Sequence, residues 1–402
     1  MGKYFSSLLN PKKSDDSQLN KSSDDSKNTK IKNESPKKHE ESIPYSYTPD
    51  ENDINNTKGA LKCIRVIKGH QKWCNCLIVL KSGNLCSCSG DRSINIYSND
   101  KYFNVILNIP SCHNDFLLFL LELYDSIIVS SSSDGTIKFW KIILNSNDNI
   151  KENSYYLIQA IFAHESDVWK VLFIPNNSQL ISCGSDSLIK IWDLDTIQET
   201  HDNNNDNDII DNKYKINFVQ NKIISDHLYW VSSIINVTNN DLNINYLVSG
   251  SGDNTIKFYN ISQNYDLTNS LNKVICCQQG TLVNYDDKRF LIGGGRGIFF
   301  YVVNFVHFQV ESKIYGGNEE INTILILKRN KVRKRTGFLL GGKERCFHFV
   351  DSYEYKDKIV KKDAHEKYIY CLILLNDNEN LIASSSYDNA IKIWKYDEFT
   401  FE

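Results

Sequence analysis

The sequence predicts an all-β chain made of a repeated unit, preceded by a tail without regular structure. From Leu61 onward, short runs of alternating apolar and polar residues are separated by clusters of Gly, Asn, Asp and Ser, a pattern typical of strands and turns. Nearly the same string also recurs along the chain, as SSDGTIKFW, SDSLIKIW, SGDNTIKFY and SYDNAIKIW. Such self-similarity indicates an array of structural repeats.

Residues 1–60 form the predicted tail, because they are rich in Ser, Asp, Lys and Asn and show no sustained apolar period. The N-terminus lacks the apolar core of a secretory signal, and no run of about 18 apolar residues is present. Eleven cysteines in such a chain favour reduced thiols in the cytosol or nucleus. The net charge of −3 disfavours binding to nucleic acid through the overall charge.

Five units share four residues at regular offsets. A turn Asp is followed six residues later by an aromatic residue, and it is preceded by a Ser at four residues and by a His at 21 to 26 residues. The five sets are His70, Ser87, Asp91 and Tyr97; His113, Ser130, Asp134 and Trp140; His164, Ser182, Asp186 and Trp192; His227, Ser249, Asp253 and Tyr259; and His365, Ser384, Asp388 and Trp394.

Two further units fit between Asp253 and Asp388, since that gap holds 135 residues and the usual period is about 40 to 45. The segments Arg289–Tyr301 and Phe338–Phe349 keep a strand–turn–strand pattern but lack the His and the Asp. The total is therefore seven units.

These features resemble the WD-repeat family, which is marked by a Gly-His or similar start, a turn Asp and a Trp-Asp end. The resemblance covers residues 61–394 and implies a seven-bladed β-propeller with four antiparallel strands, a to d, in each blade. It also implies a hydrogen-bonded His, Ser, Asp and Trp tetrad in units 1 to 4 and 7, with Tyr replacing Trp in units 1 and 4. Leu61–Lys68 should then be strand d of the last blade and pair with Ala390–Trp394, which closes the ring. The expected domains are a tail over 1–60 and a propeller over 61–402.

Three patterns that suggest chemistry have structural interpretations. A His, Asp and Ser trio occurs in hydrolases, but five copies at fixed offsets argue for architecture, so no catalytic residue is expected. Cys74, Cys76, Cys86 and Cys88 lie on adjacent predicted strands and could bind zinc or an iron–sulfur cluster. We interpret them as small apolar core residues, and we expect no metal and no cofactor. Gly293–Gly297 is glycine-rich but has no following helix to bind phosphate, so it is expected to be a turn.

The N-terminus MGKYFS fits the N-myristoylation pattern, with Gly2 as the acceptor. One myristoyl chain binds membranes weakly, so a second attachment is needed. Basic residues supply it in the expected model: Lys3, Lys12 and Lys13 in the tail, and Lys328, Arg329, Lys331, Arg333, Lys334 and Arg335 between strands a and b of unit 6. The implied topology puts the tail and this basic hairpin on the bottom side. A solvated turn, a nuclear import sequence and a nucleic-acid contact are the alternatives for the hairpin.

The His-bearing loops and Asp turns are expected on the opposite side, the top rim. Aromatic residues beside them are Trp73, Phe116, Trp230, Tyr368 and Tyr387, and Asp167 and Arg92 add charge. Aromatic anchors with few charges suit a protein or peptide partner, while partial burial against the next blade is the structural alternative.

The expected function is that of a non-catalytic scaffold for protein–protein interaction. It would be cytoplasmic, peripheral on a membrane through its lipid anchor, and a monomeric propeller within a larger complex. The alternatives are a phosphoinositide-binding propeller, whose Phe/Leu-Arg-Arg-Gly motif is matched here only by GGGRGIFF, and a nuclear WD-repeat complex subunit.

Overall fold

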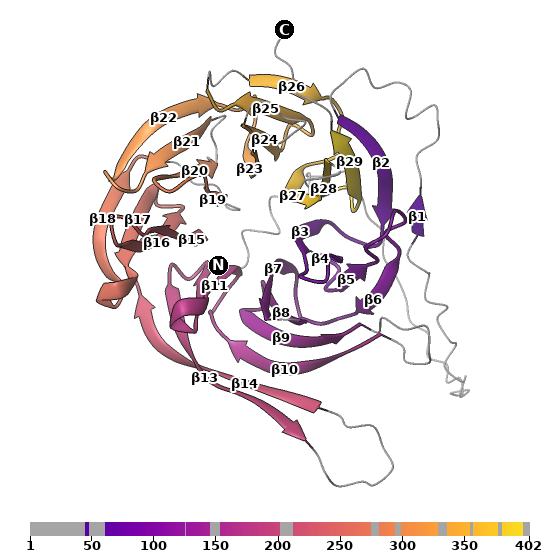
Figure 1. Ribbon diagram of the computed structural model, residues 1–402, viewed down its shortest axis with the longest axis horizontal. Coiled ribbons are helices and arrows are strands. Elements are labelled where there is room, and N and C mark those ends of the chain that lie inside the picture. Colours follow the sequence, from indigo (N-terminus) through magenta and orange to yellow (C-terminus); the bar gives the residue numbers. More distant parts are fainter. Residues whose placement is uncertain are drawn as a thin grey trace, which may run out of the picture. The chain divides into compact units, whose positions relative to one another are not determined.

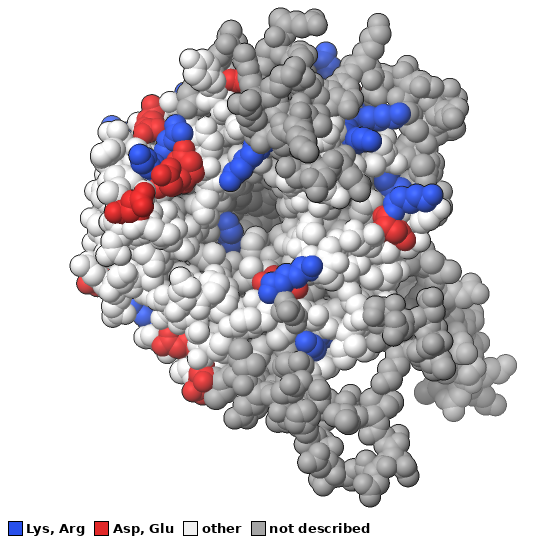
Figure 2. All heavy atoms as spheres, in the orientation of Figure 1, with Lys and Arg blue, Asp and Glu red and all other residues white. Residues whose placement is uncertain are grey.

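The computed structural model describes residues 45–47, 61–124, 126–144, 153–201, 212–274, 281–293, 299–328, 336–353, 357–376 and 380–396. All of them belong to one compact unit, residues 44–402. Its strands form seven antiparallel sheets that follow one another around a ring, with strand a of each sheet innermost (Figure 1). One face of the ring is hollowed at its centre, and Lys and Arg side chains lie around and inside the hollow (Figure 2). The prediction of an all-β, seven-bladed propeller is confirmed.

Blades 1 to 6 each contain four strands in chain order. Blades 1 and 2 consist of β3 (Cys74–Val79), β4 (Leu85–Ser89), β5 (Ile94–Tyr97), β6 (Val105–Ile109), β7 (Leu117–Tyr124), β8 (Ile127–Ser132), β9 (Thr136–Ile143) and β10 (Ser154–Phe162). Blades 3 and 4 consist of β11 (Val168–Ile174), β12 (Gln179–Gly184), β13 (Ile189–His201), β14 (Asn212–Ile224), β15 (Val231–Asn239), β16 (Ile244–Ser251), β17 (Thr255–Asn260) and β18 (Asp266–Asn272). Blades 5 and 6 consist of β19 (Leu282–Asn284), β20 (Arg289–Gly293), β21 (Phe299–Asn304), β22 (Gln309–Tyr315), β23 (Ile321–Leu327), β24 (Gly337–Gly342), β25 (Phe347–Asp351) and β26 (Asp357–Lys361). Two short 3-10 turns, η1 (Pro175–Asn177) and η2 (Ile261–Gln263), interrupt the loops.

Blade 7 joins the two ends of the propeller. It contains β27 (Ile369–Asn376), β28 (Leu381–Ser386), β29 (Ile391–Tyr396) and, as strand d, β2 (Leu61–Lys68). β2 runs antiparallel to β29, with Cys63 opposite Trp394 and Ile67 opposite Ile391, so the predicted closure is confirmed.

Within the expected tail over 1–60, the structure describes Tyr45–Tyr47. These residues form β1, which pairs antiparallel with β2 and places Tyr45 opposite Lys68. The physical reason is that β2 would otherwise present an unpaired sheet edge, and an alternating Tyr-Ser-Tyr segment can pair with it. The other residues of 1–60 lie outside the described part of the chain.

Apolar layers between neighbouring blades hold the ring together. In the described residues there are seven apolar clusters, and each consists of side chains from two adjacent blades. One of them joins blade 7 to blade 1 and so completes the ring. The blade 1 cysteines belong to two of these layers. Cys74 packs between blades 7 and 1, whereas Cys76, Cys86 and Cys88 pack between blades 1 and 2. Burial raises the pKa of Cys74, Cys86 and Cys88, that of Cys88 to about 11, which suits apolar core residues. The pKa of Cys76 is also raised, because the lowering effect of Cys371 is outweighed by the hydrogen bond with Cys88 and by burial.

Blade 3 differs from the others in the length of its outer hairpin. β13 and β14 have 13 residues each and extend beyond the ring (Figure 1). The acidic segment His201–Asp211 follows β13, and all of it except His201 lies outside the described residues.

Candidate functional site

The predicted tetrad residues meet beneath the top rim. In blade 3, the Trp192 Nε1 atom donates to the Ser182 hydroxyl at 3.0 Å, and Ser182 lies 2.8 Å from His164 Nε2. The indole N–H can only donate, so the single hydroxyl proton of Ser182 points to Nε2. The His164 Nδ1 atom then carries the ring proton and donates it to Asp186 at 2.8 Å. The result is a directed chain of hydrogen bonds from strand c to the turn.

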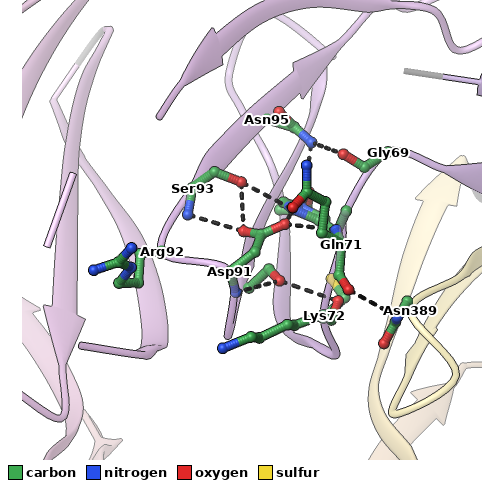
Figure 3. A network of polar contacts seen from close by, with 12 residues as sticks. Gly69, Gln71, Lys72, Asp91, Arg92, Ser93, Asn95 and Asn389 are labelled. Carbon is green, nitrogen blue, oxygen red and sulfur yellow. Dashed lines mark hydrogen bonds and ion pairs between the residues drawn. The ribbon is translucent and has the colours of Figure 1, made fainter. Parts of the chain in front are cut away.

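The Ser, His and Asp part of this chain is present in the other four blades that carry the motif. The Ser Oγ to His Nε2 distance is 2.7 Å in blade 1 and 2.6 Å in blade 7, and the Asp to His Nδ1 distance is 3.0 and 2.8 Å. Tyr97 reaches Ser87 at 3.1 Å in place of an indole, whereas the Tyr259 hydroxyl has no partner within the described part of the chain. In blade 1, Asp91 also accepts bonds from Ser93 and from the Gln71 N–H (Figure 3). All five imidazoles are buried, so the trios connect strands rather than face a substrate.

Burial and hydrogen bonding have opposite effects on the pKa values of the Asp and His side chains in these tetrads. Burial alone would raise the pKa of the Asp91 carboxyl, but bonds from His70, Ser93 and Gln71 together hold it well below its ordinary value. The pKa of Asp388 is lowered to about 2 in the same way, chiefly by His365 against the effect of burial. Burial lowers the pKa of His113 and of His365 in spite of their carboxylate partners. In the tetrads of blades 2 and 7, neutral imidazole beside ionised carboxylate is therefore the folded-state arrangement.

Replacing Asp186 by Ala should lower the free energy of unfolding by about 1–3 kcal/mol, because it leaves the buried His164 Nδ1–H without an acceptor. The measurement is denaturant unfolding of the purified protein. Asp266→Ala is the control, since the Asp266 carboxylate is exposed and pairs with Lys222 on the surface, where such pairs contribute little. Equal losses in the two variants would contradict the structural role of the tetrad.

Acid should destabilise the propeller in two stages. Because the pKa values of His113 and His365 are lowered in the folded protein, the unfolded chain binds protons at a higher pH than the folded protein does. The contribution of these two histidines to the free energy of unfolding is therefore complete above about pH 6.5 and is lost as the pH falls below that value. The depressed pKa values of Asp91, Asp134, Asp253 and Asp388 add a second loss below about pH 4. Urea unfolding at pH 7.5, 5 and 3 measures this fall, with one value above, one between and one below the two stages. A free energy of unfolding that stays constant over the three values would show that the tetrads are not linked to proton uptake.

A fifth repeated residue was not singled out in the sequence. Four residues after the turn Asp, a Lys reaches back to the carbonyl oxygen of the residue before the tetrad His. The four residues are Lys138, Lys190, Lys257 and Lys392. In the sequence, these lysines could have been recognised from the Ile-Lys dipeptide that recurs before the final aromatic residue of the repeat.

Five of the predicted rim residues occupy equivalent positions in their blades, in the loop just before strand a. The backbone carbonyl oxygen of each accepts a hydrogen bond from a backbone N–H in the turn between strands b and c of the same blade. The accepting residues are Trp73, Phe116, Asp167, Trp230 and Tyr368. Glycine is needed under the two indoles, because a Cβ on Gly90 or Gly252 would lie 2.5 or 2.3 Å from the ring.

Four of the predicted rim residues form a continuous surface that we call the aromatic arc: Trp73, Phe116, Tyr368 and Tyr387. The Trp73 ring stacks on Tyr387 of the preceding blade, with centroids 5.1 Å apart and planes at 7°, and meets Phe116 of the next blade edge-on at 4.9 Å. Tyr387 also lies 6.1 Å from Tyr368. The arc therefore crosses blades 7, 1 and 2 and remains half-buried or exposed.

Lysine side chains surround the aromatic arc. Lys72 Nζ lies 5.2 Å from the centre of the Phe116 ring, Lys367 Nζ lies 5.1 Å from that of Tyr387, and Lys343 Nζ lies 5.8 Å from that of Tyr368. A cavity of about 160 Å³ lies at the inner strands and is lined by Phe119, Lys170, Tyr370 and neighbouring residues. Since the Tyr370 ring also contacts Tyr387 at 6.1 Å, the arc and this cavity are adjacent.

The remaining predicted rim residues are separate from the arc. Trp230 in blade 4 contacts the ring of Tyr229, and its indole N–H has no partner within the described residues. Asp167 accepts a hydrogen bond from the Ser185 hydroxyl at 3.0 Å, so its carboxylate serves its own turn. Arg92 is exposed and points away from the Asp91 network (Figure 3).

Most of the predicted membrane-binding residues lie outside the described part of the chain. This holds for Gly2, Lys3, Lys12, Lys13, Arg329, Lys331, Arg333, Lys334 and Arg335, while Lys328 is exposed just after β23. Among the described residues, no helix has the length and apolar character needed to cross a membrane.

Known proteins resemble this chain in its repeats and in its fold. The WD domain, G-beta repeat (WD40) model matches residues 61–98, 112–141, 156–193, 218–260 and 357–395. The solved WD40 β-propeller domain of Doa1 superposes with a TM-score of 0.60 at 16% identity, covering 84% of this chain and 97% of that one. At that identity the likeness shows the fold alone.

Curated relatives match over limited segments. Polyadenylation factor subunit 2 of Candida albicans is 29% identical over 25% of this chain and 17% of its own length. The ribosome biogenesis protein WDR12 homolog of Culex quinquefasciatus is 22% identical over 60% of this chain and 54% of its own. Target of rapamycin complex subunit wat1 of Schizosaccharomyces pombe is 23% identical over 35% and 41%. The chain thus spans about half or less of the length of these relatives.

The five matched segments coincide with the blades that carry the tetrad, and no matched segment covers residues 261–356. Propellers with these repeats are generally non-catalytic scaffolds for protein interaction. This chain therefore carries WD40 repeats, matched five times, in a closed seven-bladed β-propeller.

Proposed function

We propose that this protein is a non-catalytic scaffold that binds a partner protein across the aromatic arc. The observation that carries the proposal is the contact of three aromatic rings from three consecutive blades, Tyr387, Trp73 and Phe116, on the rim. Large rings in rigid positions provide contact area at little cost in conformational entropy, and such residues dominate the binding energy of interfaces.

The charges around the arc favour an acidic partner segment with apolar anchors. Lys72 and Lys367 each place an ammonium group over an aromatic ring, where a partner carboxylate could pair with it at the rim. Two relatives are named as parts of larger assemblies, a polyadenylation factor subunit and a target of rapamycin complex subunit. Those names support a role within a complex without naming this chain's partner.

Replacing Trp73 by Ala should reduce partner capture at least about tenfold, since truncation of a central aromatic anchor typically costs 2 kcal/mol or more. Affinity purification of the full chain with quantitative mass spectrometry measures the change. Tyr102→Ala is the matched control, because Tyr102 is an exposed ring in the turn between strands c and d of blade 1, away from the arc. Partners that remain with Trp73→Ala and are lost with Tyr102→Ala would place the binding surface elsewhere.

We further propose that the scaffold is cytoplasmic and attached peripherally to a membrane by myristoylated Gly2 and the basic hairpin Lys328–Arg335. The support is in the sequence: the MGKYFS start and six basic residues among the eight of KRNKVRKR. β23 ends just before Lys328, so the basic hairpin follows the end of strand a that lies away from the rim, whereas Tyr45, the first described residue after the tail, pairs with Lys68 at the rim end of β2. A membrane below would leave the partner surface open above.

A further inference from the structure

Three side chains with metal-binding atoms converge at the top turn of blade 6, between β24 and β25. The Glu344 carboxylate, the Cys346 thiol and the His348 imidazole each offer one atom, and these atoms lie within 4.8 Å of one another. Glu344 and Cys346 lie in the turn before β25, where Arg345 between them has a φ of +64°, and His348 lies on β25 itself. Among the described residues, this is the one set of three His, Cys, Asp or Glu side chains brought this close.

This cluster stands where blades 1 to 4 and 7 have their tetrad. Glu344 accepts the N–H of Asn318 at 2.9 Å, as Asp388 accepts that of Glu366 at 3.0 Å in blade 7. The position of the tetrad His is taken by Gly317, and a Cβ there would lie 3.1 Å from His348 Nε2. The imidazole therefore fills the same space but enters from strand c instead of from the loop before strand a.

The bonding of this imidazole differs from that in a tetrad. In the other blades, the hydroxyl and the carboxylate bind opposite nitrogens of the ring. In blade 6, Cys346 Sγ at 3.1 Å and Glu344 Oε2 at 2.9 Å both approach Nε2. The Nε2 atom carries at most one proton, so it cannot form a full hydrogen bond with both the thiol and the carboxylate. A cation between the three atoms would contact all of them. A Cys-His-carboxylate nucleophile would need the carboxylate on the other nitrogen.

The space beside the cluster suits one small ion. A cavity of about 10 Å³ is lined by the three side chains, by Gly316 and by Glu319 and Glu320, and that volume is about the size of one water molecule. Glu320 pairs with Lys343 at 2.9 Å. The exposed Glu319 lies on the same wall and could supply a further oxygen.

We propose that Glu344, Cys346 and His348 bind a divalent cation of the zinc class, with water or Glu319 in the fourth position. Thiolate and imidazole favour zinc over calcium or magnesium, which take oxygen ligands. Tetrahedral zinc separates sulfur from nitrogen by about 3.5 Å and nitrogen from oxygen by about 3.3 Å, so the present distances must open by about 0.4 Å. On binding, the Cys346 S–H bond breaks, its proton passes to the buffer and a metal–sulfur bond forms.

The test is titration of the full-length, chelator-treated protein with Zn²⁺ against a chromophoric competitor, and with Co²⁺ by absorption spectroscopy. We expect one equivalent to bind, one proton to be released and a thiolate-to-cobalt charge-transfer band to appear. Loss of groups that only support metal ligands weakens binding about 10- to 100-fold, so Cys346→Ser and His348→Gln should weaken it at least about 100-fold. The matched controls Cys63→Ser, in β2, and His307→Gln, on an exposed turn, should bind as the wild type does.

Two results would overturn the proposal. One is wild-type affinity with an unchanged charge-transfer band in Cys346→Ser, because the cation would then sit at other cysteines. The other is a folded wild-type chain that binds Zn²⁺ no more tightly than His348→Gln does. Should Cys346→Ser fail to fold, Glu344→Gln keeps the test decisive, since its amide oxygen still accepts from Asn318 while the charge is gone. That variant should lose affinity about tenfold or more.

Discussion

A chain that begins at residue 71 should fail to fold, whereas one that begins at residue 61 should fold like the full-length protein. The difference is β2, which supplies strand d of blade 7 from the opposite end of the described propeller. Its Leu61 and Ile67 side chains are 0% and 1% exposed, and burying each contributes about 1.5–3 kcal/mol. Together with the lost strand pairing, this is comparable to the 5–15 kcal/mol that stabilises a typical domain.

Thermal unfolding of the three chains, followed by circular dichroism, measures the effect. Single substitutions in β2 refine it, because Leu61→Ala should cost about 2–5 kcal/mol, while Lys62→Ala, at an exposed position of the same strand, should change stability by less than about 0.5 kcal/mol. If the chain starting at residue 71 melts at the same temperature as that starting at residue 61, the ring does not depend on this closure.

The positions of the turns and of strand c within each repeat could be predicted from the sequence, because they depend on the spacing of residues close together in the chain. Each unit places its Asp in a tight turn and its aromatic residue six positions later on strand c, and the backbone of a four-stranded blade leaves little freedom in that spacing. β1 could not be predicted in this way, since three residues carry no period, and its pairing depends on the free edge of a strand that the chain reaches only later.

The rim and blade 6 show a different limit of the sequence. The shared position of Trp73, Phe116 and Tyr368 follows from the repeat, but the stacking of Trp73 on Tyr387 depends on how consecutive blades meet. In blade 6, the search for a His before the turn Asp finds none, because the imidazole of His348 comes after the turn and a Glu replaces the Asp. The sequence does show a Glu, a Cys and a His at every second position, in Glu-Arg-Cys-Phe-His. Only the fold shows that these side chains occupy the space that a tetrad fills in other blades.

Replacing Gly2 by Ala should release the protein from membranes into the cytosol. N-myristoylation requires glycine at this position, and burial of the acyl chain contributes about 0.8 kcal/mol per CH₂, or about ten kcal/mol in all. Neutralising the six basic residues of Lys328–Arg335 with Gly2 intact should weaken binding by about 1 kcal/mol for each residue that approaches an anionic surface. This weakening should vanish on neutral vesicles and shrink at high salt, because the surface potential extends only about a Debye length.

Co-sedimentation of the acylated protein with vesicles of neutral and of anionic lipid separates the two contributions. Gly2→Ala should lose binding to both kinds, and Gly59→Ala, the same change elsewhere in the N-terminal segment, should lose none. The hairpin variant should bind neutral vesicles as the wild type does and anionic vesicles less tightly. Wild-type binding of the hairpin variant to anionic vesicles would mean that Lys328–Arg335 is a solvated turn, and the acyl chain would then need another second attachment. Membrane binding by Gly2→Ala at the wild-type level would show that the protein is not held by a myristoyl group, and the bottom of the propeller would no longer be expected to face a lipid surface.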